Sequence, residues 1–183
     1  MILQHLKNLY RTANWFGQTD HDRIKYVRLD KNERTIPYPK EIYEGMLSTL
    51  KNEVIPMYPD QGPLYKKLSE FLGIDIGHLL LTSGSDSAIK SIYETYVDNG
   101  DKVIYLWPTY AMIDVYAEMF EAEKIKIGYS AKLELDFELL LTSIDEEVKV
   151  VFIANPNQPT GTLLTQDQID CLIQKTKETN TLL

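Results

Sequence analysis

Three short stretches of the chain place polar or aromatic side chains directly after apolar runs. Residues 83–87 (SGSDS) open a helical pattern, and residues 107–110 (WPTY) follow the apolar run at 103–106. Residues 155–161 (NPNQPTG) follow another apolar run at 150–154. Glycine and free backbone N–H groups at a helix N-terminus form an anion site, and the other two stretches add a flat aromatic ring and side-chain amides. Together these groups suit a planar, phosphorylated, heteroaromatic ligand.

Each stretch taken alone also has an ordinary structural explanation. Ser85 or Asp86 would then cap its own helix. Trp107 and Tyr110 would pack in the core, and residues 155–161 would form a capped turn. The prolines and side-chain amides of that third stretch are more than a turn requires, and this excess favours a binding site.

Apolar spacing predicts the elements that hold these stretches. Helices are predicted at 42–50, 64–72, 87–97, about 108–120, 136–144 and 166–176, and strands at 78–82, 103–106, 124–128 and 148–153. Strands that alternate with helices predict right-handed βαβ units, and hence a three-layer α/β/α fold with a mostly parallel sheet. Ligands bind such sheets at the carboxyl ends of the strands, where the three stretches lie.

Three single residues carry further structural predictions. Pro108 is expected at or near the first turn of its helix, where proline is tolerated. Gly100 is expected to end the preceding helix in a left-handed conformation. Cys171 is expected to be a small core residue on the last helix.

The composition limits the class of protein. The 183 residues suit one domain of ordinary size, and 44% hydrophobic and 25% charged residues are typical of a globular protein. A net charge of −8 argues against nucleic acid or an anionic membrane as the main partner. A single cysteine fits a reducing compartment, and no apolar run is long enough for a membrane span, so we expect a cytoplasmic protein. The three histidines lack the spacing of metal ligands, so no metal is expected.

The series LTSGSDSAI, WPTY and NPNQPTG resembles the pyridoxal-phosphate-dependent class I/II aminotransferases, and it is most similar to their histidinol-phosphate aminotransferase branch. Residues 29–33 (LDKNE) resemble the L-x-x-N-E motif of that branch, and residues 57–60 (MYPD) resemble its R-Y-P-D motif. The resemblance implies the large domain of the aspartate-aminotransferase-like fold. Residues 1–26 would form an arm or leading helix, and residues 27–183 the first part of the domain that binds pyridoxal 5′-phosphate.

The resemblance also implies roles for single residues around that cofactor. Gly84 and the backbone N–H groups of Ser85 and Asp86 would hold its phosphate, and Tyr110 would stack on its ring. We expect the Asp86 carboxylate to cap the helix or to face aside, because it would otherwise repel the phosphate. The family places an asparagine, which donates to the phenolic oxygen of the cofactor, where this chain has Gln158.

Gln158 is one methylene longer than the asparagine of the family, and Asn157 precedes it. Either Gln158 folds back to make the contact, or Asn157 helps, or the contact is weaker; we expect Gln158 to keep the role. Tyr58 would reach the cofactor phosphate of a neighbouring subunit, which implies a homodimer. Asn32 and Glu33 would lie near the substrate entrance.

Two catalytic groups of the family have no counterpart in this sequence. These are the Schiff-base lysine, in an S-K-type loop, and the acid that faces the ring nitrogen, in a D-E-A-Y-type strand end. Lys175 and Lys177 lie on a predicted helix end, where solvated charges are usual. We therefore predict no catalytic residue in this chain and expect an amino-terminal half that ends before the lysine and is inactive alone.

Three functions are compatible with these motifs. The complete protein would transfer an amino group between an amino acid or an amino-alcohol phosphate and a 2-oxo acid. A decarboxylase or carbon–sulfur lyase that uses the same fold and cofactor is the first alternative. A non-enzymatic α/β module that binds phosphate or nucleotide is the second, although the chain has neither G-x-G-x-x-G nor G-x-x-x-x-G-K-[ST].

Overall fold

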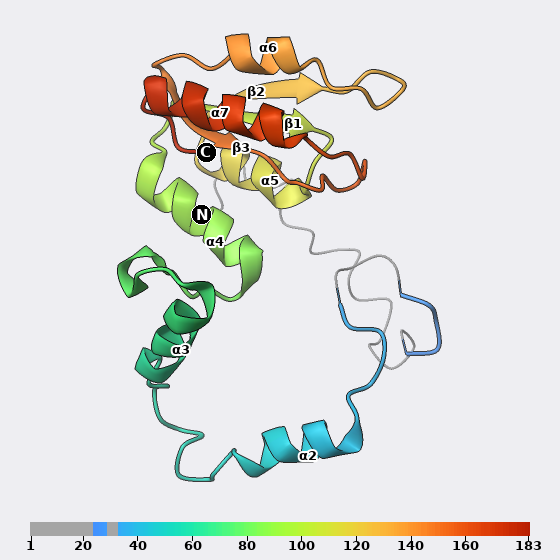
Figure 1. Cartoon of the computed structure of the whole chain (residues 1–183), viewed down its shortest axis with the longest axis vertical. Coiled ribbons are helices and arrows are strands. Elements are labelled where there is room, and N and C mark those ends of the chain that lie inside the picture. Colours follow the sequence, from blue (N-terminus) through green and yellow to red (C-terminus); the bar gives the residue numbers. More distant parts are fainter. Residues whose placement is uncertain (1–23, 29–32) are drawn as a thin grey trace, which may run out of the picture. The chain divides into compact units, whose positions relative to one another are not determined.

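The computed structural model describes residues 24–28 and 33–183 of the chain (Figure 1). These residues fall into two compact units, which meet in the sequence between Leu81 and Thr82. The predicted arm at residues 1–26 lies almost wholly outside the described residues and stays a prediction. Within the described ranges, no helix has the length and apolar content needed to cross a membrane.

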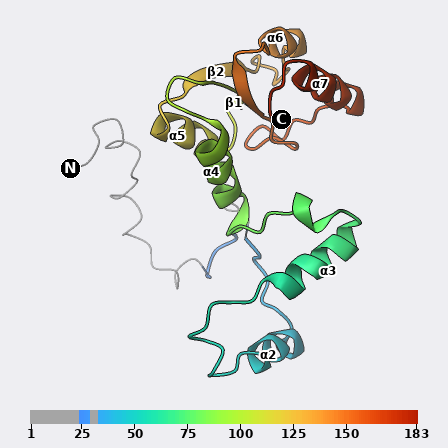
Figure 2. The same ribbon diagram turned by 90° about the vertical axis from the view of Figure 1, so that its left-hand side faces the viewer.

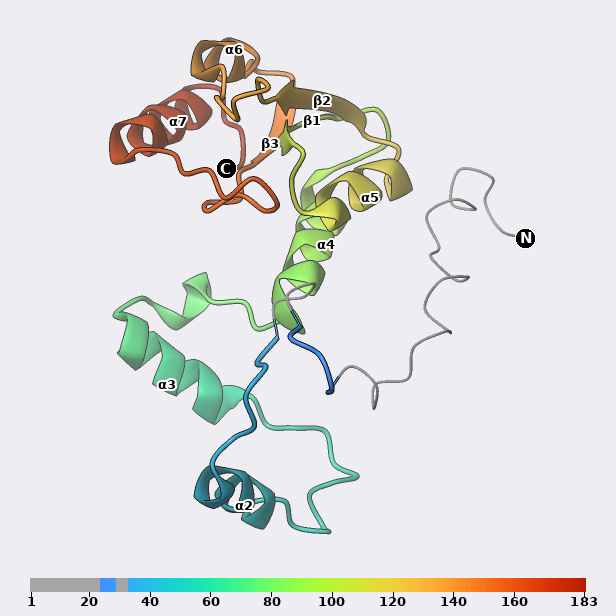
Figure 3. The same ribbon diagram turned by 90° about the vertical axis from the view of Figure 1, so that its right-hand side faces the viewer.

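The unit that begins at Thr82 is built on three parallel strands. Their bounds are β1 (Lys102–Trp107), β2 (Glu123–Gly128) and β3 (Val148–Phe152), and their order in the sheet is β2-β1-β3. Four helices accompany them: α4 (Gly84–Tyr96), α5 (Ala111–Met119), α6 (Phe137–Thr142) and α7 (Gln166–Glu178). Figures 2 and 3 show α6 and α7 on one face of the sheet and α5 on the other.

Side chains of β1 alternate between two hydrophobic clusters, one on each face of the sheet. Val103 and Tyr105 pack with α4 and α5, whereas Ile104 and Leu106 pack with α6 and α7. A strand that is buried on both faces reads as a continuous apolar run, as the sequence here does. The predicted three-layer α/β/α fold is confirmed.

Tyr93 connects α4 to helix α5 and to strand β3. Its ring is fully buried and lies 5.1 Å from the ring of Phe152 and 5.8 Å from that of Phe120, centroid to centroid. Its hydroxyl donates to the carbonyl oxygen of Ile113 in α5 at 3.0 Å. Burial, with the nearby charge of Asp114, holds the pKa of Tyr93 far above the usual range, so the hydroxyl remains a donor.

Strand β3 contains one extra residue. Lys102 pairs with Val148 but Val103 pairs with Val150, so Lys149 has no partner on β1. Because of this bulge Val148 packs with α6 and α7, while Val150 packs on the opposite face. On the other side of β3, the backbone of Leu182 pairs with Val150 in the parallel direction.

Strand β2 carries alternating lysines that bond to helix α5. Lys126 lies 2.6 Å from the Asp114 carboxylate, and Lys124 forms an ion pair with Glu118. Burial opposes ionisation of Asp114, yet hydrogen bonds from Lys126 and the buried Tyr105 lower the pKa of this carboxyl below its usual value.

Local signals in the sequence set the ends of several helices. Helix α7 begins at a capping box, in which Thr165 and Gln168 each bond to the other's backbone N–H. The Asp136 side chain caps α6 by accepting from the backbone N–H of Leu139. Gly100 adopts the predicted left-handed conformation, with a φ of +85°, but it lies in the turn beyond the helix, whose C-cap is Val97.

The second unit contains helices α2 (Lys40–Ser48) and α3 (Gly62–Leu72), followed by a 3₁₀ turn, η2 (Ile76–His78). Neither α2 nor α3 has a buried residue. The hydroxyl of Tyr65 accepts a hydrogen bond from the backbone N–H of Leu81 at 3.0 Å, which ties the segment after η2 back to α3.

Three predictions about local structure were wrong. The apolar run at 78–82 is not a strand, because no strand among the described residues pairs with it. Pro108 precedes its helix, which begins at Ala111 after an N-cap at Tyr110. Cys171 is exposed, and its neighbour Leu172 is the residue that α7 buries. The apolar pattern does not show whether a run finds a strand to pair with, at which residue a helix begins, or which face of a helix is buried.

We predict that Tyr93→Phe lowers the free energy of unfolding by about 1 kcal/mol, because it deletes one buried hydrogen bond and keeps the ring stack. The matched control is Tyr96→Phe on the same helix, where the side chain is 54% exposed. Urea unfolding followed by circular dichroism measures both. Equal stability of the two variants would contradict a stabilising role for the Tyr93 hydroxyl.

Candidate functional site at the carboxyl ends of the strands

The connections that follow β1 and β3 leave the sheet in opposite directions. The loop after β1 leads to α5 on one face, and the loop after β3 leads to α7 on the other. Since β1 and β3 are neighbours, their carboxyl ends mark the point where the connections change from one face of the sheet to the other, which is the usual ligand site of a parallel sheet. Tyr110, Asn157 and Gln158 all belong to these two loops.

Helix α4 begins at Gly84, three residues earlier than predicted. Ser83 is its N-cap residue and makes no side-chain capping hydrogen bond, so neither Ser85 nor Asp86 is the cap. The first backbone N–H groups of a helix have no partner within the helix, and the helix dipole makes this end positive. The start of α4 therefore has the polarity of an anion site.

The carboxylate of Asp86 is directed toward helix α5. Burial, together with the nearby Asp86 carboxylate, raises the pKa of the Tyr116 hydroxyl to about 12. The Oδ1 atom of Asp86 is buried and has no hydrogen-bond partner within the described part of the chain. Asp86 thus faces aside, one of the two orientations expected from the sequence.

Tyr110 is half-buried at the start of α5. Its side chain packs against the cluster that contains Tyr93 and Phe152. The adjacent Thr109 is almost fully buried, with 7% of its surface exposed. The core therefore supports the Tyr110 ring, while the side chain as a whole is only half-buried.

The side-chain amide of Asn157 is fully used by contacts within the protein. Its Oδ1 accepts from the Thr109 hydroxyl at 2.7 Å, and its Nδ2 donates to the Pro108 carbonyl at 2.9 Å and to Thr160 at 2.8 Å. Only 2% of Asn157 is exposed, whereas Gln158 is exposed. The side-chain amide of Asn157 therefore has no N–H left for a ligand, whereas the side chains of Asn155 and Gln158 on the same loop are exposed.

The structure brings some predicted site residues together and leaves others apart. The hydrogen bond between Thr109 and Asn157 joins the loop of Tyr110 to the loop of Gln158. Glu33 and Tyr58 belong to the other unit, where Glu33 pairs with Arg28 at 3.5 Å and Tyr58 is fully exposed. Asn32 lies outside the described residues.

Sequence reasoning missed four polar residues that bond within these loops: Thr109, Tyr129, Thr160 and Thr162. Two of them stand inside the quoted motifs, but a threonine in a turn has no signal that tells which partner it bonds. Tyr129 follows β2 and belongs to no motif. Its position at the third strand end was the one available clue.

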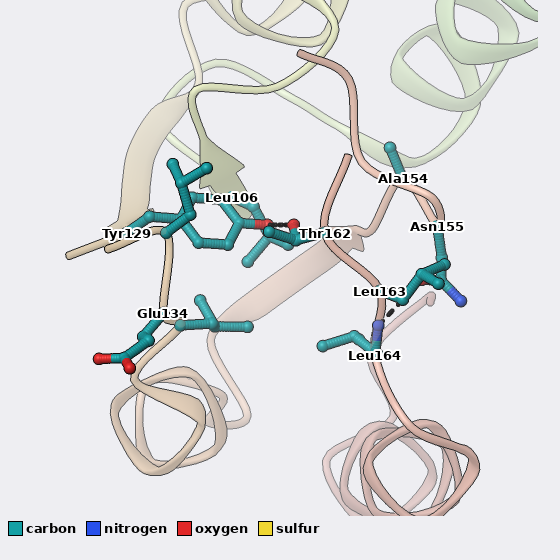
Figure 4. Close-up of a pocket in the computed structure, with 10 residues that line it drawn as sticks. Leu106, Tyr129, Glu134, Ala154, Asn155, Thr162, Leu163 and Leu164 are labelled. Carbon is teal, nitrogen blue, oxygen red and sulfur yellow. Dashed lines mark hydrogen bonds between the residues drawn. The ribbon is translucent and has the colours of Figure 1, made fainter. Parts of the chain in front are cut away.

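A cavity of about 360 Å³ lies under the loop after β3, on the face of the sheet that α6 and α7 cover. Leu106 and Tyr129 line one side of it, and Asn155, Leu163 and Leu164 line the other (Figure 4). The Thr162 hydroxyl donates to that of Tyr129 at 3.0 Å across its wall. None of the residues predicted to contact a ligand lines this cavity.

Comparison with known proteins gives consistent matches. Residues 25–183 match the family described as aminotransferase class I and II. The chain is 27% identical over 177 residues to histidinol-phosphate aminotransferase of Caldanaerobacter subterraneus, covering 94% of this chain and 50% of that protein. It is 31% identical over 165 residues to the enzyme of the same name from Brachyspira hyodysenteriae, covering 88% and 45%. The chain thus spans about half the length of the curated relatives it matches.

Solved structures support the same fold. Cystalysin from Treponema denticola, whose crystal structure contains pyridoxal 5′-phosphate, superposes with a TM-score of 0.74 at 20% identity, over 99% of this chain and 50% of its own. A double mutant of Thermus thermophilus aspartate aminotransferase gives a TM-score of 0.72 at 18% identity, over 82% and 42%.

We predict that Gly84→Ala lowers the free energy of unfolding by about 1–2 kcal/mol, because residue 84 has a positive φ that residues with a Cβ adopt only at a cost. The φ is +82°, and an added Cβ would meet no atom within 4 Å, so backbone strain acts alone. Gly128→Ala is the control, since that site has equal room and no positive φ. A loss of stability no larger than that of the control would contradict the strain.

Proposed function

Because the chain belongs to the class I and II aminotransferase family, we propose that it contributes the cofactor site of a pyridoxal-phosphate enzyme. This enzyme transfers an amino group between an amino-alcohol phosphate of the histidinol-phosphate type and a 2-oxo acid. The substrate class is inferred from one observation, the similarity to relatives named histidinol-phosphate aminotransferase, which extends over up to 94% of this chain. The family motifs at the start of α4 and after β1 and β3 support the cofactor.

The start of α4 fits the phosphate group of this cofactor. The backbone N–H groups of Ser85 and Asp86 stand at the positive end of the helix dipole, and Ser83 makes no side-chain cap that would occupy them. Asp86 would be a poor neighbour for a phosphate dianion, but its carboxylate lies near the Tyr116 hydroxyl of α5, whose pKa it helps to raise. The electrostatics of the helix end therefore favour an anion.

Tyr110 and Gln158 fit the ring of the cofactor. When bound, pyridoxal 5′-phosphate supplies an electron-withdrawing ring that stabilises negative charge on the reacting carbon of the substrate. Tyr110 would provide a flat stacking surface that loses little conformational entropy. Gln158 would donate from its amide to the phenolic oxygen, since the amide of Asn157 is fully engaged.

We extend the proposal to a homodimer in which Tyr58 contacts the phosphate held by the neighbouring subunit. The support is the resemblance of residues 57–60 to the family motif and the complete exposure of the Tyr58 side chain. Asn32 and Glu33 are proposed to lie near the substrate entrance, on the same ground of motif resemblance. The amino donor and the 2-oxo acid are the small-molecule partners of the reaction.

We predict that Tyr110→Ala weakens the affinity for pyridoxal 5′-phosphate by about tenfold, because stacking on an aromatic ring contributes about 1–1.5 kcal/mol. Equilibrium dialysis with pyridoxal 5′-phosphate measures this without requiring turnover. Tyr96→Ala, at an exposed position on α4, is the control and should bind like the unaltered chain. If both variants bind equally, Tyr110 does not stack on the cofactor.

The substrate class is tested in the longest polypeptide that carries this chain. With pyridoxal 5′-phosphate, histidinol phosphate and a 2-oxo acid, the expected product is the amino acid that corresponds to the 2-oxo acid. Release of carbon dioxide or of a sulfur compound from an amino acid, without amino transfer, would identify a decarboxylase or a carbon–sulfur lyase instead.

A further inference from the structure

A continuous series of side-chain hydrogen bonds crosses the carboxyl ends of all three strands. It begins at Thr109 after β1, which lies 2.7 Å from Asn157, and it continues from Asn157 to Thr160 at 2.8 Å. Thr160 bonds to Thr162 at 2.8 Å, and Thr162 bonds to Tyr129 after β2 at 3.0 Å. We call these five residues the strand-end chain.

The direction of every hydrogen bond in the strand-end chain is determined. The carbonyl of Pro108 can only accept, so it fixes the Nδ2 side of Asn157, and Oδ1 must accept from Thr109. Nδ2 gives its second hydrogen to Thr160. Thr162 donates to Tyr129, so the hydrogen between the two threonines comes from Thr160.

The loop after β3 depends on such side-chain bonds. Pro156 and Pro159 have no backbone N–H, so two of its residues cannot donate to the backbone. The backbone bonds that remain are those from Asn157 to the Thr162 carbonyl at 2.9 Å and from Gly161 to the Asn157 carbonyl at 2.7 Å. These close the loop on itself, whereas the strand-end chain attaches it to the loops after β1 and β2.

We propose that the strand-end chain is a positioning device that acts as one unit and sets the β3–α7 loop relative to the β1–α5 loop. Thr109 precedes Tyr110 and Asn157 precedes Gln158, so the bond between them holds the two residues assigned to the cofactor ring in register. The effect on cofactor rests on the proposed function; the effect on the loop does not.

A unit of this kind has a measurable signature. Each hydrogen bond in a series polarises and strengthens the next one. When a buried group loses its partner, the remaining hydrogen bonds of the series become weaker, and the unsatisfied group costs free energy. Thr109 and Asn157 are 7% and 2% exposed, so water cannot replace a lost partner there without a structural change. Removing the hydrogen bond at either end of the series should therefore increase hydrogen exchange of the same loop. Removing the hydrogen bonds at both ends should increase this exchange little more than removing one.

Hydrogen exchange in the full chain, followed by mass spectrometry of the segment 154–164, tests the device directly. Tyr129→Phe removes only the last hydroxyl of the series (Figure 4), and it should raise exchange of this segment about fivefold, as expected for one hydrogen bond. Thr109→Val should act similarly from the other end, while Thr109→Ser, which keeps the hydroxyl, should restore slow exchange. Tyr96→Phe is the control. Exchange in Tyr129→Phe equal to that of the control would overturn the proposal.

The double variant Thr109→Val/Tyr129→Phe tests whether the series acts as one unit. Exchange close to that of the single variant with the larger effect supports the unit, whereas a rise of about 25-fold, the product of two independent effects, would overturn it.

Equilibrium dialysis then separates the positioning proposal from the proposed function. Weaker binding of pyridoxal 5′-phosphate in Thr109→Val, but not in Thr109→Ser, supports positioning of the cofactor site. If no form of the chain binds it while the exchange pattern holds, the proposed function fails and the loop coupling stands.

Discussion

Strand β1 is paired with a parallel strand on each side and buried on both faces, so only its two ends remain open. This constraint determines much of the rest. The core divides into two clusters because alternate β1 side chains must pack against different helices. The loops after β1 and β3 lead to opposite faces because the helices that follow them lie on opposite faces. The place where the connections change face is thus a result of sheet order, and the residues of the two loops decide what can bind there.

The parts of the fold that depend on local pattern were predictable from the sequence. The three strands of the sheet and the helices that cover it were located, because each buries a continuous or periodic set of apolar residues. The run at 78–82 shows the limit of this reasoning. It has the composition of a strand, but a strand exists only when another strand pairs with it, and that partner is not encoded in the run. Cys171 shows the same limit for the inner face of a helix.

For the site, the motifs identify candidate residues, but the fold determines which side chains bond to one another. The motifs indicate Tyr110 and Gln158, and their contacts with the cofactor stay predictions. The contacts of Asn157 could not be predicted, because its partner Thr109 is 48 positions away in the sequence. The Asp86 carboxylate is a second case. It lies near Tyr116 of the next helix, and the sequence of residues 83–87 contains no sign of that neighbour.

The lysines of β2 have a consequence for how the protein meets other copies of itself. Among the strands described, β2 is at an edge of the sheet, and the backbone N–H and C=O groups on its outer side could pair with a strand of another molecule. An incoming strand would have to pack beside Lys124 and Lys126, whose charges are already neutralised by Asp114 and Glu118 of α5. Displacing those ion pairs would leave charge uncompensated at the new contact. The charged row therefore discourages edge-to-edge aggregation, a form of protection that β-sheet proteins commonly need.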